Sequence, residues 1–292
     1  MEKQNIIQAG KIAKQAKEYA KKLIKPNMHL LEIAEKIESK IIELGGKPAF
    51  PVNLSINEIA AHYTPSYDDP STASGLLKVD LGVHVKGYVA DTAFSLDLEN
   101  NEENKKLIFT AEKALENAIK EFQEEKTTSE IGKVIQKTIE SHNLNPIVNL
   151  SGHSMEKYDL HAGITIPNIN DNKNIILKKG LYAIEPFTTT GNGKVQDGKP
   201  SGIYMLIHAK NTRSPISREV LDYISEEYET LPFCSRWLIK KFGTKALIAL
   251  KQLEEQEIIH QFPQLIEVSK AKVAQAEDTI FLDGKEKIVT TL

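Results

Sequence analysis

Apolar residues recur at helical spacing near the start of the chain. Between residues 4 and 24, isoleucine, leucine and alanine side chains share one side of a helical projection, with lysines between them. This pattern predicts an amphipathic helix over 4–24 whose lysines face solvent rather than form a basic arm. Pro26 ends this helix, and a second helix is predicted from about 29 to 44, before Gly45-Gly46.

Strand-like patterns follow, and the order then repeats. Residues 76–95 favour two β-strands around a turn at Lys86-Gly87. Residues 102–125 and 128–143 predict a second pair of helices. Three further strand-like segments come next, at 147–150, 162–166 and 181–189. Two helices followed by strands therefore occur twice, which indicates a weak internal repeat of pattern rather than of residue identity.

The rest of the chain mixes helices with short strands. Thr190–Ser201 is rich in Gly, Lys and Asp, which predicts a surface loop. Helices are expected at 217–229, 234–241 and 244–256, and strands at 203–209, 257–261, 265–268, 273–282 and 286–290. The helical stretch from 215 to 256 therefore looks inserted into a β-rich second half.

Composition narrows the class of protein without indicating an activity. The 292 residues are 40% hydrophobic and 26% charged, which is typical of a soluble globular protein. The apolar runs fall far short of the roughly 18 residues of a membrane span, and the N-terminus does not resemble a signal peptide. The single cysteine, Cys234, is predicted to be buried and inert, which fits a reducing cytoplasm. A net charge of -3 gives no reason to expect a nucleic-acid or membrane partner.

Two aspartates in the predicted hairpin are candidates for a metal site. Aspartate is depleted in strands, yet Asp80 and Asp91 lie one in each strand. A two-residue turn at 86–87 pairs Gly82 with Asp91. Asp80 then shares a face with Asp91, at a Cα separation of about 7–8 Å. Gly82 is expected to leave an empty gap, which a pair of ions about 3.5–4 Å apart could straddle. The hairpin alone leaves open both a metal site and an exposed acidic face, and a three-residue turn would separate the aspartates.

The second half adds polar groups in apolar surroundings. His153 follows a short apolar segment, and His161 lies in the next loop. Glu185 lies inside a strand-like apolar run, and Glu277 adjoins another. A carboxylate in such a setting is costly unless it is paired or binds a metal. The joint occurrence of these residues favours metal chemistry more than any one of them does.

The sequence resembles the methionine aminopeptidase family at these positions. Five residues match the family's metal ligands in order and in their flanking residues, namely Asp80, Asp91, His153, Glu185 and Glu277. Four short motifs also match: AAHYTP at 60–65, LSGHS at 150–154, AIEP at 183–186 and QAE at 275–277. The resemblance covers essentially the whole chain. The long interval between the last two ligands is similar to that of type II enzymes.

The resemblance implies a fold and a domain organisation. The expected architecture is the α/β (α+β) pita-bread fold of creatinase and the aminopeptidases, in which two αα-ββ halves are related by a pseudo-twofold. The catalytic domain would comprise residues 1–190 and 266–292, and a helical, winged-helix-like insert would span 191–265. The short segment before the first motif is similar to the archaeal form, which lacks the basic N-terminal extension of eukaryotic type II enzymes.

The resemblance also implies a cofactor. Two divalent ions per chain are expected, of Co, Mn, Fe or Zn. Asp91 and Glu277 would bridge them, Asp80 would bind one ion, and the other would be held by His153 and Glu185. Four carboxylates and one imidazole balance the charge of two divalent cations. Oxygen-rich ligation with one nitrogen suits these metals better than a thiolate site would.

The implied activity is removal of the N-terminal methionine from nascent proteins when the second residue is small, with a metal-bridging water as nucleophile. Glu185 would also carry a proton, and His161 would stabilise the developing oxyanion. His62 would contact the scissile amide, or alternatively form a hydrogen bond that only holds its loop. The methionine side chain would lie among four apolar residues, with His161 at the edge: Phe50, Ile203, Phe262 and Leu265.

Two other functions stay open from the sequence. One is an X-Pro peptidase on the same fold, although such enzymes carry a whole domain before the first metal aspartate. The other is a non-catalytic relative that binds the ribosome or nucleic acid, although such relatives have lost metal ligands that are intact here. We expect a cytoplasmic monomer whose partners are N-terminal peptides of nascent proteins. Docking on the ribosome is left open, and no membrane or specific nucleic-acid partner is expected.

Overall fold

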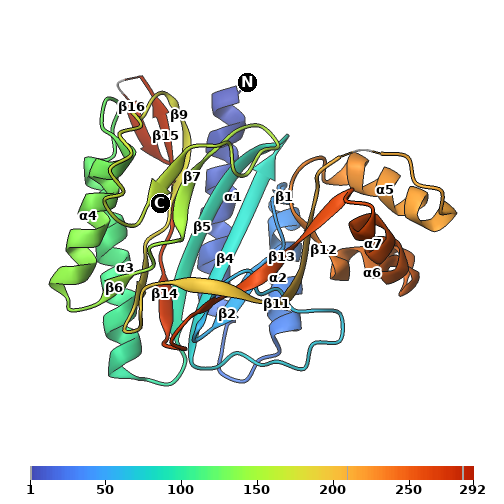
Figure 1. The fold of residues 1–292 in the computed structure, drawn as a ribbon, viewed down its shortest axis with the longest axis horizontal. Helices are drawn as coiled ribbons and strands as arrows, with labels where there is room; N and C mark the ends of the chain where they lie inside the picture. Colours follow the sequence, from blue (N-terminus) through green and yellow to red (C-terminus); the bar gives the residue numbers. More distant parts are fainter. Residues whose placement is uncertain (1, 209, 285) are drawn as a thin grey trace.

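Two pairs of helices cover a set of antiparallel sheets (Figure 1). This computed structural model describes residues 2–208, 210–284 and 286–292. The first pair, α1 (Glu2–Leu23) and α2 (Leu30–Glu43), and the second pair, α3 (Glu102–Glu121) and α4 (Thr128–Ser141), confirm the helix predictions to within a few residues. None of the helices in the described ranges is long and apolar enough to cross a membrane.

The central hairpin joins β4 (Leu76–Val85) to β5 (Tyr88–Asp97) through a two-residue turn. Lys86 and Gly87 have φ values of 53° and 87°, and positive φ at both central residues is the requirement of a type I′ turn. The register pairs Gly82 with Asp91, as the sequence predicts. Helix α1 packs against both strands. The short strands β1 (Lys47–Pro48) and β2 (Asn53–Ile56) pair with the other edge of β4, and the sequence did not predict them.

A five-stranded sheet forms the second half. Its order is β16-β15-β9-β7-β8, and its strands are β7 (Ser151–Met155), β8 (Thr165–Pro167), β9 (Gly180–Ile184), β15 (Asp278–Asp283) and β16 (Glu286–Val289). An isolated bridge between Ala93 and Glu277 connects this sheet to β5. The halves therefore meet along β5 and β15, and each consists of two helices followed by antiparallel strands, in agreement with the predicted repeat.

Helices α5 (Pro215–Glu227), α6 (Ser235–Phe242) and α7 (Lys245–Glu255) form a separate group with its own apolar cluster (Figure 1). They pack against a four-stranded sheet of order β12-β11-β13-β3, made of β12 (Phe233–Cys234), β11 (Val195–Leu206), β13 (Ile259–Glu267) and β3 (Ile59–Ala61). The helical stretch is confirmed, and the boundaries of the insert stay a prediction. Cys234 is buried, and burial raises the pKa of its thiol to about 12, as expected of an inert cysteine.

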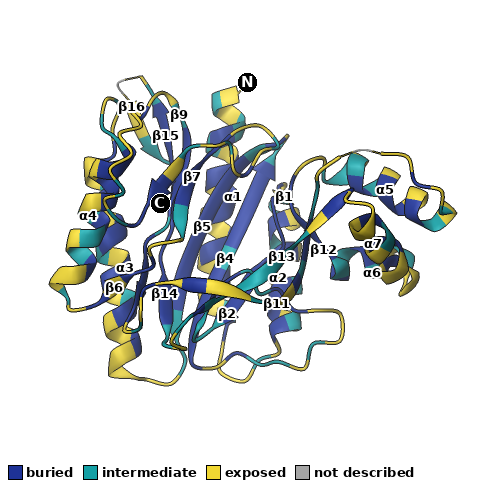
Figure 2. Ribbon diagram, viewed as in Figure 1, coloured by how far each residue is buried: buried dark blue, intermediate teal, exposed yellow. Residues whose placement is uncertain are grey.

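The predicted loop at Thr190–Ser201 is wrong from residue 195 onward. Strand β11 begins at Val195 and pairs with β13. The first half of β11 has mostly exposed side chains (Figure 2), so its composition is that of a loop although its backbone pairs with β13. The strand predicted at 203–209 ends at Leu206, and Ala209 lies outside the described residues.

Other predicted strands have different limits. The segments predicted at 257–261 and 265–268 form one strand, β13, with a register shift near Pro263. Segment 147–150 falls between β6 (Asn145–Pro146) and β7. The runs 181–189 and 273–282 are each divided, into β9 with β10 (Phe187–Thr189) and into β14 (Val273–Gln275) with β15. Each break contains a glutamate, Glu185 in the first and Glu277 in the second. These two residues therefore lie outside the regular strands.

A buried ion pair attaches α1 to the strands where the halves meet. Lys17 Nζ lies 2.7 Å from Asp278 Oδ1 and donates to Thr92 Oγ1 at 3.0 Å. The Thr92 hydroxyl donates in turn to the carbonyl oxygen of Glu277 at 2.8 Å. Lys17, Thr92 and Asp278 are all buried, so the prediction that the lysines of this helix face solvent is wrong for Lys17. This network joins α1, β5 and β15 directly behind two of the candidate metal ligands.

We expect Lys17→Met to lower the free energy of unfolding by about 3–5 kcal/mol, because Asp278 would keep a buried charge without its partner. Lys14→Met is the matched control, since Lys14 is exposed on the same helix, and it should change stability by less than about 0.5 kcal/mol. Urea unfolding followed by circular dichroism measures both variants. Equal stability of the two would show that the pair does not hold α1 in place.

Candidate metal centre

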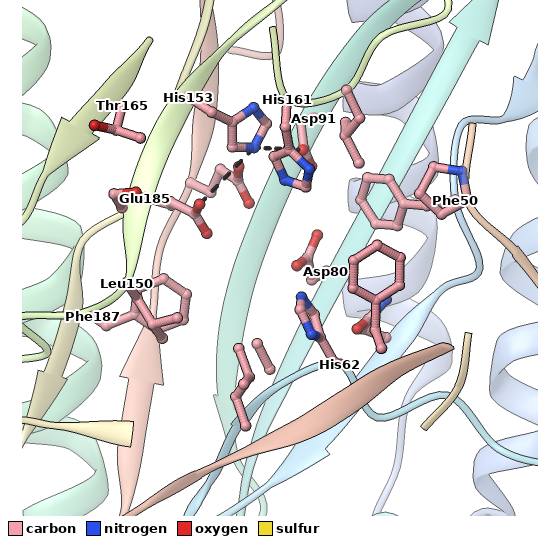
Figure 3. Close-up of a pocket in the computed structure, with 18 of the residues that line it drawn as sticks. Phe50, His62, Asp80, Asp91, Leu150, His153, His161, Thr165, Glu185 and Phe187 are labelled. Atoms are coloured by element: carbon pink, nitrogen blue, oxygen red, sulfur yellow. Dashed lines mark ion pairs between the residues drawn. The ribbon is translucent and has the colours of Figure 1, made fainter. Parts of the chain in front are cut away.

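A cavity of about 350 Å³ is lined by residues from both halves and from the β11–β13 sheet (Figure 3). Every residue that the sequence analysis assigns to the site lines this cavity: Phe50, His62, Asp80, Asp91, His153, His161, Glu185, Ile203, Phe262, Leu265 and Glu277. The fold therefore brings together positions that are far apart in the sequence.

The five candidate ligands come from five neighbouring segments. Asp80 and Asp91 lie on the paired strands β4 and β5. His153 lies on β7, opposite Ala183 of β9, and Glu185 directly follows β9. Glu277 precedes β15 and is held next to β5 by backbone hydrogen bonds to Ala93 at 3.0 and 3.3 Å. Strand pairing and the Ala93–Glu277 bridge together bring these side chains toward one space.

The side-chain geometry fits a cation. One ligand atom from each of Asp91, His153 and Glu277 can be chosen so that all lie within 4.8 Å of one another. His153 Nε2 is 3.7 Å from Asp91 Oδ2 and 4.0 Å from Glu185 Oε1. Figure 3 shows Asp80, Asp91, His153 and Glu185 around a common space. Carboxylate oxygens and one imidazole nitrogen are a donor set suited to divalent transition metals.

Several oxygen atoms of the cluster are buried without a partner. Oδ1 of Asp80, Oδ1 of Asp91 and Oε1 of Glu277 have no hydrogen-bond partner within the described part of the chain. Buried polar atoms in proteins almost always have such a partner. Three of the five candidate ligands thus carry such an oxygen, and a bound cation would satisfy atoms that the protein itself leaves unsatisfied.

The burial and mutual repulsion of the carboxylates also favour the binding of a cation. Burial, together with the neighbouring carboxylates, raises the pKa values of Asp91, Glu185 and Glu277 well above their ordinary range. Burial raises the pKa of Asp80 to about 7. Gln275 Nε2 donates to Glu185 Oε2 at 3.2 Å and to Glu277 Oε2 at 3.3 Å, and its hydrogen bond partly offsets the rise in the pKa of Glu185. Carboxylates this close repel one another when ionised, and cations between them would remove the repulsion.

Two further histidines border the cluster. The rings of His153 and His161 pack edge to face, with centroids 4.4 Å apart. His62 Nδ1 lies 3.2 Å from the carbonyl oxygen of Pro263, and the His62 ring contacts Phe262 at a centroid distance of 5.6 Å. Burial lowers the pKa of His62 to about 4, so this imidazole is neutral near pH 7. The structural hydrogen bond considered for His62 is present, and the ring lines the cavity as well.

The gap expected opposite Asp91 is not empty. A Cβ atom built on Gly82 would lie 2.3 Å from Cε1 of Phe50, so the Phe50 ring occupies the space that a side chain at position 82 would need. The expectation of an empty gap is therefore wrong. The missing side chain of Gly82 instead allows an aromatic wall to approach the two aspartates.

Some residues of the site were not found from the sequence. Asn53, Thr165, Phe187 and Pro232 line the cavity, and Gln275 hydrogen-bonds two candidate ligands. Gln275 precedes Glu277 by two positions, and this spacing could have identified it because alternate residues of an extended segment share a face. No local signal indicates Pro232, because only the tertiary fold brings it to the cavity.

A model of metallopeptidase family M24 matches residues 4–219, and the chain belongs to this family. Within it, the chain is similar over its whole length to methionine aminopeptidases. That of Pyrococcus abyssi is 47% identical, with 100% of both chains covered. That of Methanocaldococcus jannaschii is 46% identical, with 99% of this chain and 98% of the relative covered. Family membership implies the use of divalent metal ions.

Solved structures share the fold. A thermophilic Arx1 has a TM-score of 0.83 at 15% identity and covers 98% of this chain and 89% of its own. A methionine aminopeptidase from Thermotoga maritima has a TM-score of 0.72 at 21% identity, with 99% and 96% covered. The prolidase of Pyrococcus furiosus has a TM-score of 0.62 at 16% identity, with 100% and 64% covered. These likenesses confirm the predicted pita-bread fold, and at such identities they show the fold alone.

The geometry predicts that Asp91→Asn weakens the binding of Mn²⁺, because it removes charge from a cluster whose oxygens lack other partners. The loss should exceed the about 10- to 100-fold that removal of an outer-shell partner costs. Isothermal titration calorimetry of the metal-depleted protein measures the affinity. Asp222→Asn, on the exposed side of α5, should leave it unchanged, and equal affinities of the two variants would argue against the site.

Proposed function

We propose that the protein is a methionine aminopeptidase, a hydrolase that removes the N-terminal methionine from peptides and nascent proteins. The observation that carries the proposal is the convergence of Asp80, Asp91, His153, Glu185 and Glu277 on one cavity, with partnerless oxygens among them. Sequence identity of 46–47% to methionine aminopeptidases over the full length supports the same activity.

The cluster would hold two divalent ions of Co, Mn, Fe or Zn. Asp91 and Glu277, whose segments are joined by the backbone bridge at Ala93, would contact both ions. Asp80 would hold one ion, and the other would be held by His153 and Glu185. When bound, such ions polarise the scissile carbonyl group and lower the pKa of a water nucleophile.

The remaining chemistry belongs to side chains at the cavity. Glu185 would accept a proton and return it to the leaving amine, since its Oε1 faces the cluster and its Oε2 is oriented by Gln275. His161, beside His153, would donate a hydrogen bond to the carbonyl oxygen as negative charge develops there. His62 would contact the scissile amide while its Nδ1 is held by Pro263.

An apolar pocket for the methionine side chain would lie next to the cluster. Phe50 and Ile203 are 6% and 4% exposed, and Phe262 and Leu265 of β13 complete the walls. Two of these walls are fixed by strand pairing, since Ile203 lies opposite Cys234 and Leu265 opposite Ala61. Crowding near His62 would restrict the second residue of the substrate to small side chains.

The proposed activity is tested with a Met-Gly-Ser peptide and added Mn²⁺ or Co²⁺. We expect release of methionine that requires the metal, is lost with a chelator, and is abolished in His153→Ala, because the imidazole is the only nitrogen ligand proposed. An Ala-Pro peptide should be cleaved far more slowly. Full activity of His153→Ala would contradict the ligand assignment, and preference for the proline peptide would favour an X-Pro peptidase instead.

The pocket assignment is tested by Gly82→Ala. The added methyl group would displace the Phe50 ring, whose Cε1 lies 2.3 Å from its position. We expect kcat/KM for Met-Gly-Ser to fall by about 10-fold or more, since one methylene group in an apolar pocket is worth about 10- to 200-fold in kcat/KM. Gly45→Ala is the control, because Gly45 is exposed, lies outside the cavity lining, and has no atom within 4 Å of an added Cβ. Its φ of +88° makes that substitution cost some stability, and an equal kcat/KM in both variants would refute the pocket assignment.

Two further aspects belong to the same proposal. The enzyme would work in the cytoplasm as a monomer on the N-termini of nascent chains. A non-catalytic role is less well supported, because all five candidate ligands are present and converge. The likeness to Arx1 concerns the fold alone.

A further inference from the structure

A second buried ion pair lies outside the metal cluster. Arg236, in the first turn of α6, forms a two-pronged pair with Glu38 of α2: Nη1 is 2.7 Å from Oε2 and Nη2 is 2.9 Å from Oε1. The two residues are 4% and 6% exposed. The indole Nε1 of Trp237 donates to the same carboxylate at 2.9 Å. The pair joins the helical group α5–α7 to the first helix pair.

The remaining hydrogen bonds of this pair reach two loops. Arg236 Nε donates to the carbonyl oxygen of Pro65 at 3.1 Å, and Nη2 donates to Thr64 Oγ1 at 3.3 Å. On the other side, Glu38 Oε1 accepts from the backbone N–H of Val52 at 3.2 Å. The Thr64 hydroxyl completes the network by donating to the Val52 carbonyl oxygen at 2.9 Å.

These two loops and the Arg236 segment form walls of the cavity. Phe50 and Asn53 lie on either side of Val52, and His62 precedes Thr64 by two residues. Pro232 also lines the cavity and lies in the segment that leads to Arg236. The guanidinium group of Arg236 therefore connects three walls of the site, although Arg236 is not among the residues that line the cavity.

The conformation of His62 needs such support. Its φ is +61°, a left-handed conformation that costs a non-glycine residue about 1–3 kcal/mol and persists only when its surroundings hold it. The Pro263 carbonyl fixes the ring, at 3.2 Å from Nδ1. The backbone after His62 is fixed separately, by a hydrogen bond from Leu54 N to the Tyr63 carbonyl oxygen at 2.7 Å and by the contacts of Arg236 to Thr64 and Pro65.

We propose that Arg236, together with Glu38, is a positioning residue that sets the placement of His62 and of the Phe50 wall for catalysis. This inference rests on the proposed aminopeptidase function. Stability alone is a weak explanation for the pair, because well-packed apolar residues often replace a buried ion pair without loss of stability. What apolar residues cannot reproduce is the fixed fork of donors that Arg236 directs at Glu38, Thr64 and Pro65.

The test separates positioning from folding with a double variant. Arg236→Met with Glu38→Gln removes both charges, so it leaves no buried charge unpaired and is expected to fold with near-normal stability. It nevertheless loses the contacts to Thr64 and Pro65. We expect kcat for Met-Gly-Ser to fall by about 10- to 100-fold, the scale of loss that a 1 Å misplacement causes, while Mn²⁺ affinity by calorimetry stays unchanged.

Two further measurements identify the residue through which Arg236 acts. Arg236→Lys keeps the charge but not the fork, and it should lower kcat in the same direction. In a His62→Ala background, the double substitution should cause much less further loss than in the wild type, because the two effects share one route. Independent, additive losses would overturn the proposal that Arg236 acts through His62.

The control uses an exposed ion pair on the same helix α2. Glu32→Gln with Lys36→Met removes a pair with a 2.6 Å separation and should leave kcat unchanged. A folded double variant of Arg236 and Glu38 with wild-type kcat would overturn the inference alone. If that double variant does not fold, Arg236→Lys decides in the same way. Absence of methionine release by the wild-type protein with any tested metal would instead overturn the proposed function.

Discussion

Repulsion among four carboxylates in one largely buried cavity is the interaction on which the rest of the structure depends. Asp91 and Glu277 are 3% and 1% exposed, and burial raises the pKa values of both. Such groups are costly unless a cation or hydrogen bonds compensate them. The backbone of Asp91 is held by one side chain: the Thr279 hydroxyl accepts from the Asp91 N–H and donates to its carbonyl oxygen, both at 2.8 Å. The carboxylate oxygens without a partner belong to residues that line the cavity, where a bound cation would pair with them.

The duplicated architecture explains how carboxylates can be held this close. Each half packs its helices against its strands, and the strands of the two halves lie side by side where β5 meets β15 (Figure 1). The bridge between Ala93 and Glu277 sets the distance between the halves. Behind the cluster, Lys17 supplies a positive charge to Asp278, the residue next to Glu277. Charge is therefore balanced on the outer side by a side chain, and on the inner side it would be balanced by metal.

The sequence predicted what depends on local signals. The helix pairs follow from apolar spacing, and the register of Gly82 with Asp91 follows from the turn at 86–87. The ligand set required resemblance to a family, because no local pattern brings His153 to Asp91. Contacts between distant segments could not be predicted from pattern: the Phe50 ring fills the space beside Gly82, and Arg236 joins Glu38 to Thr64. Strand β11 was missed because its exposed residues have the composition of a loop.

The sheet β12-β11-β13-β3 shows why the inserted region matters for the site. Strand β13 crosses the predicted limit of the insert at residue 265 and pairs with β3, the strand that directly precedes His62. Ile203 and Leu265 reach the cavity from this same sheet. A region attached only by flexible linkers would leave these walls free to move. Here the inserted region is joined to the first half of the chain by the pairing of β13 with β3 and by the Arg236–Glu38 pair. The shape of the pocket therefore depends on how the inserted helices pack, even though the candidate metal ligands lie outside this region.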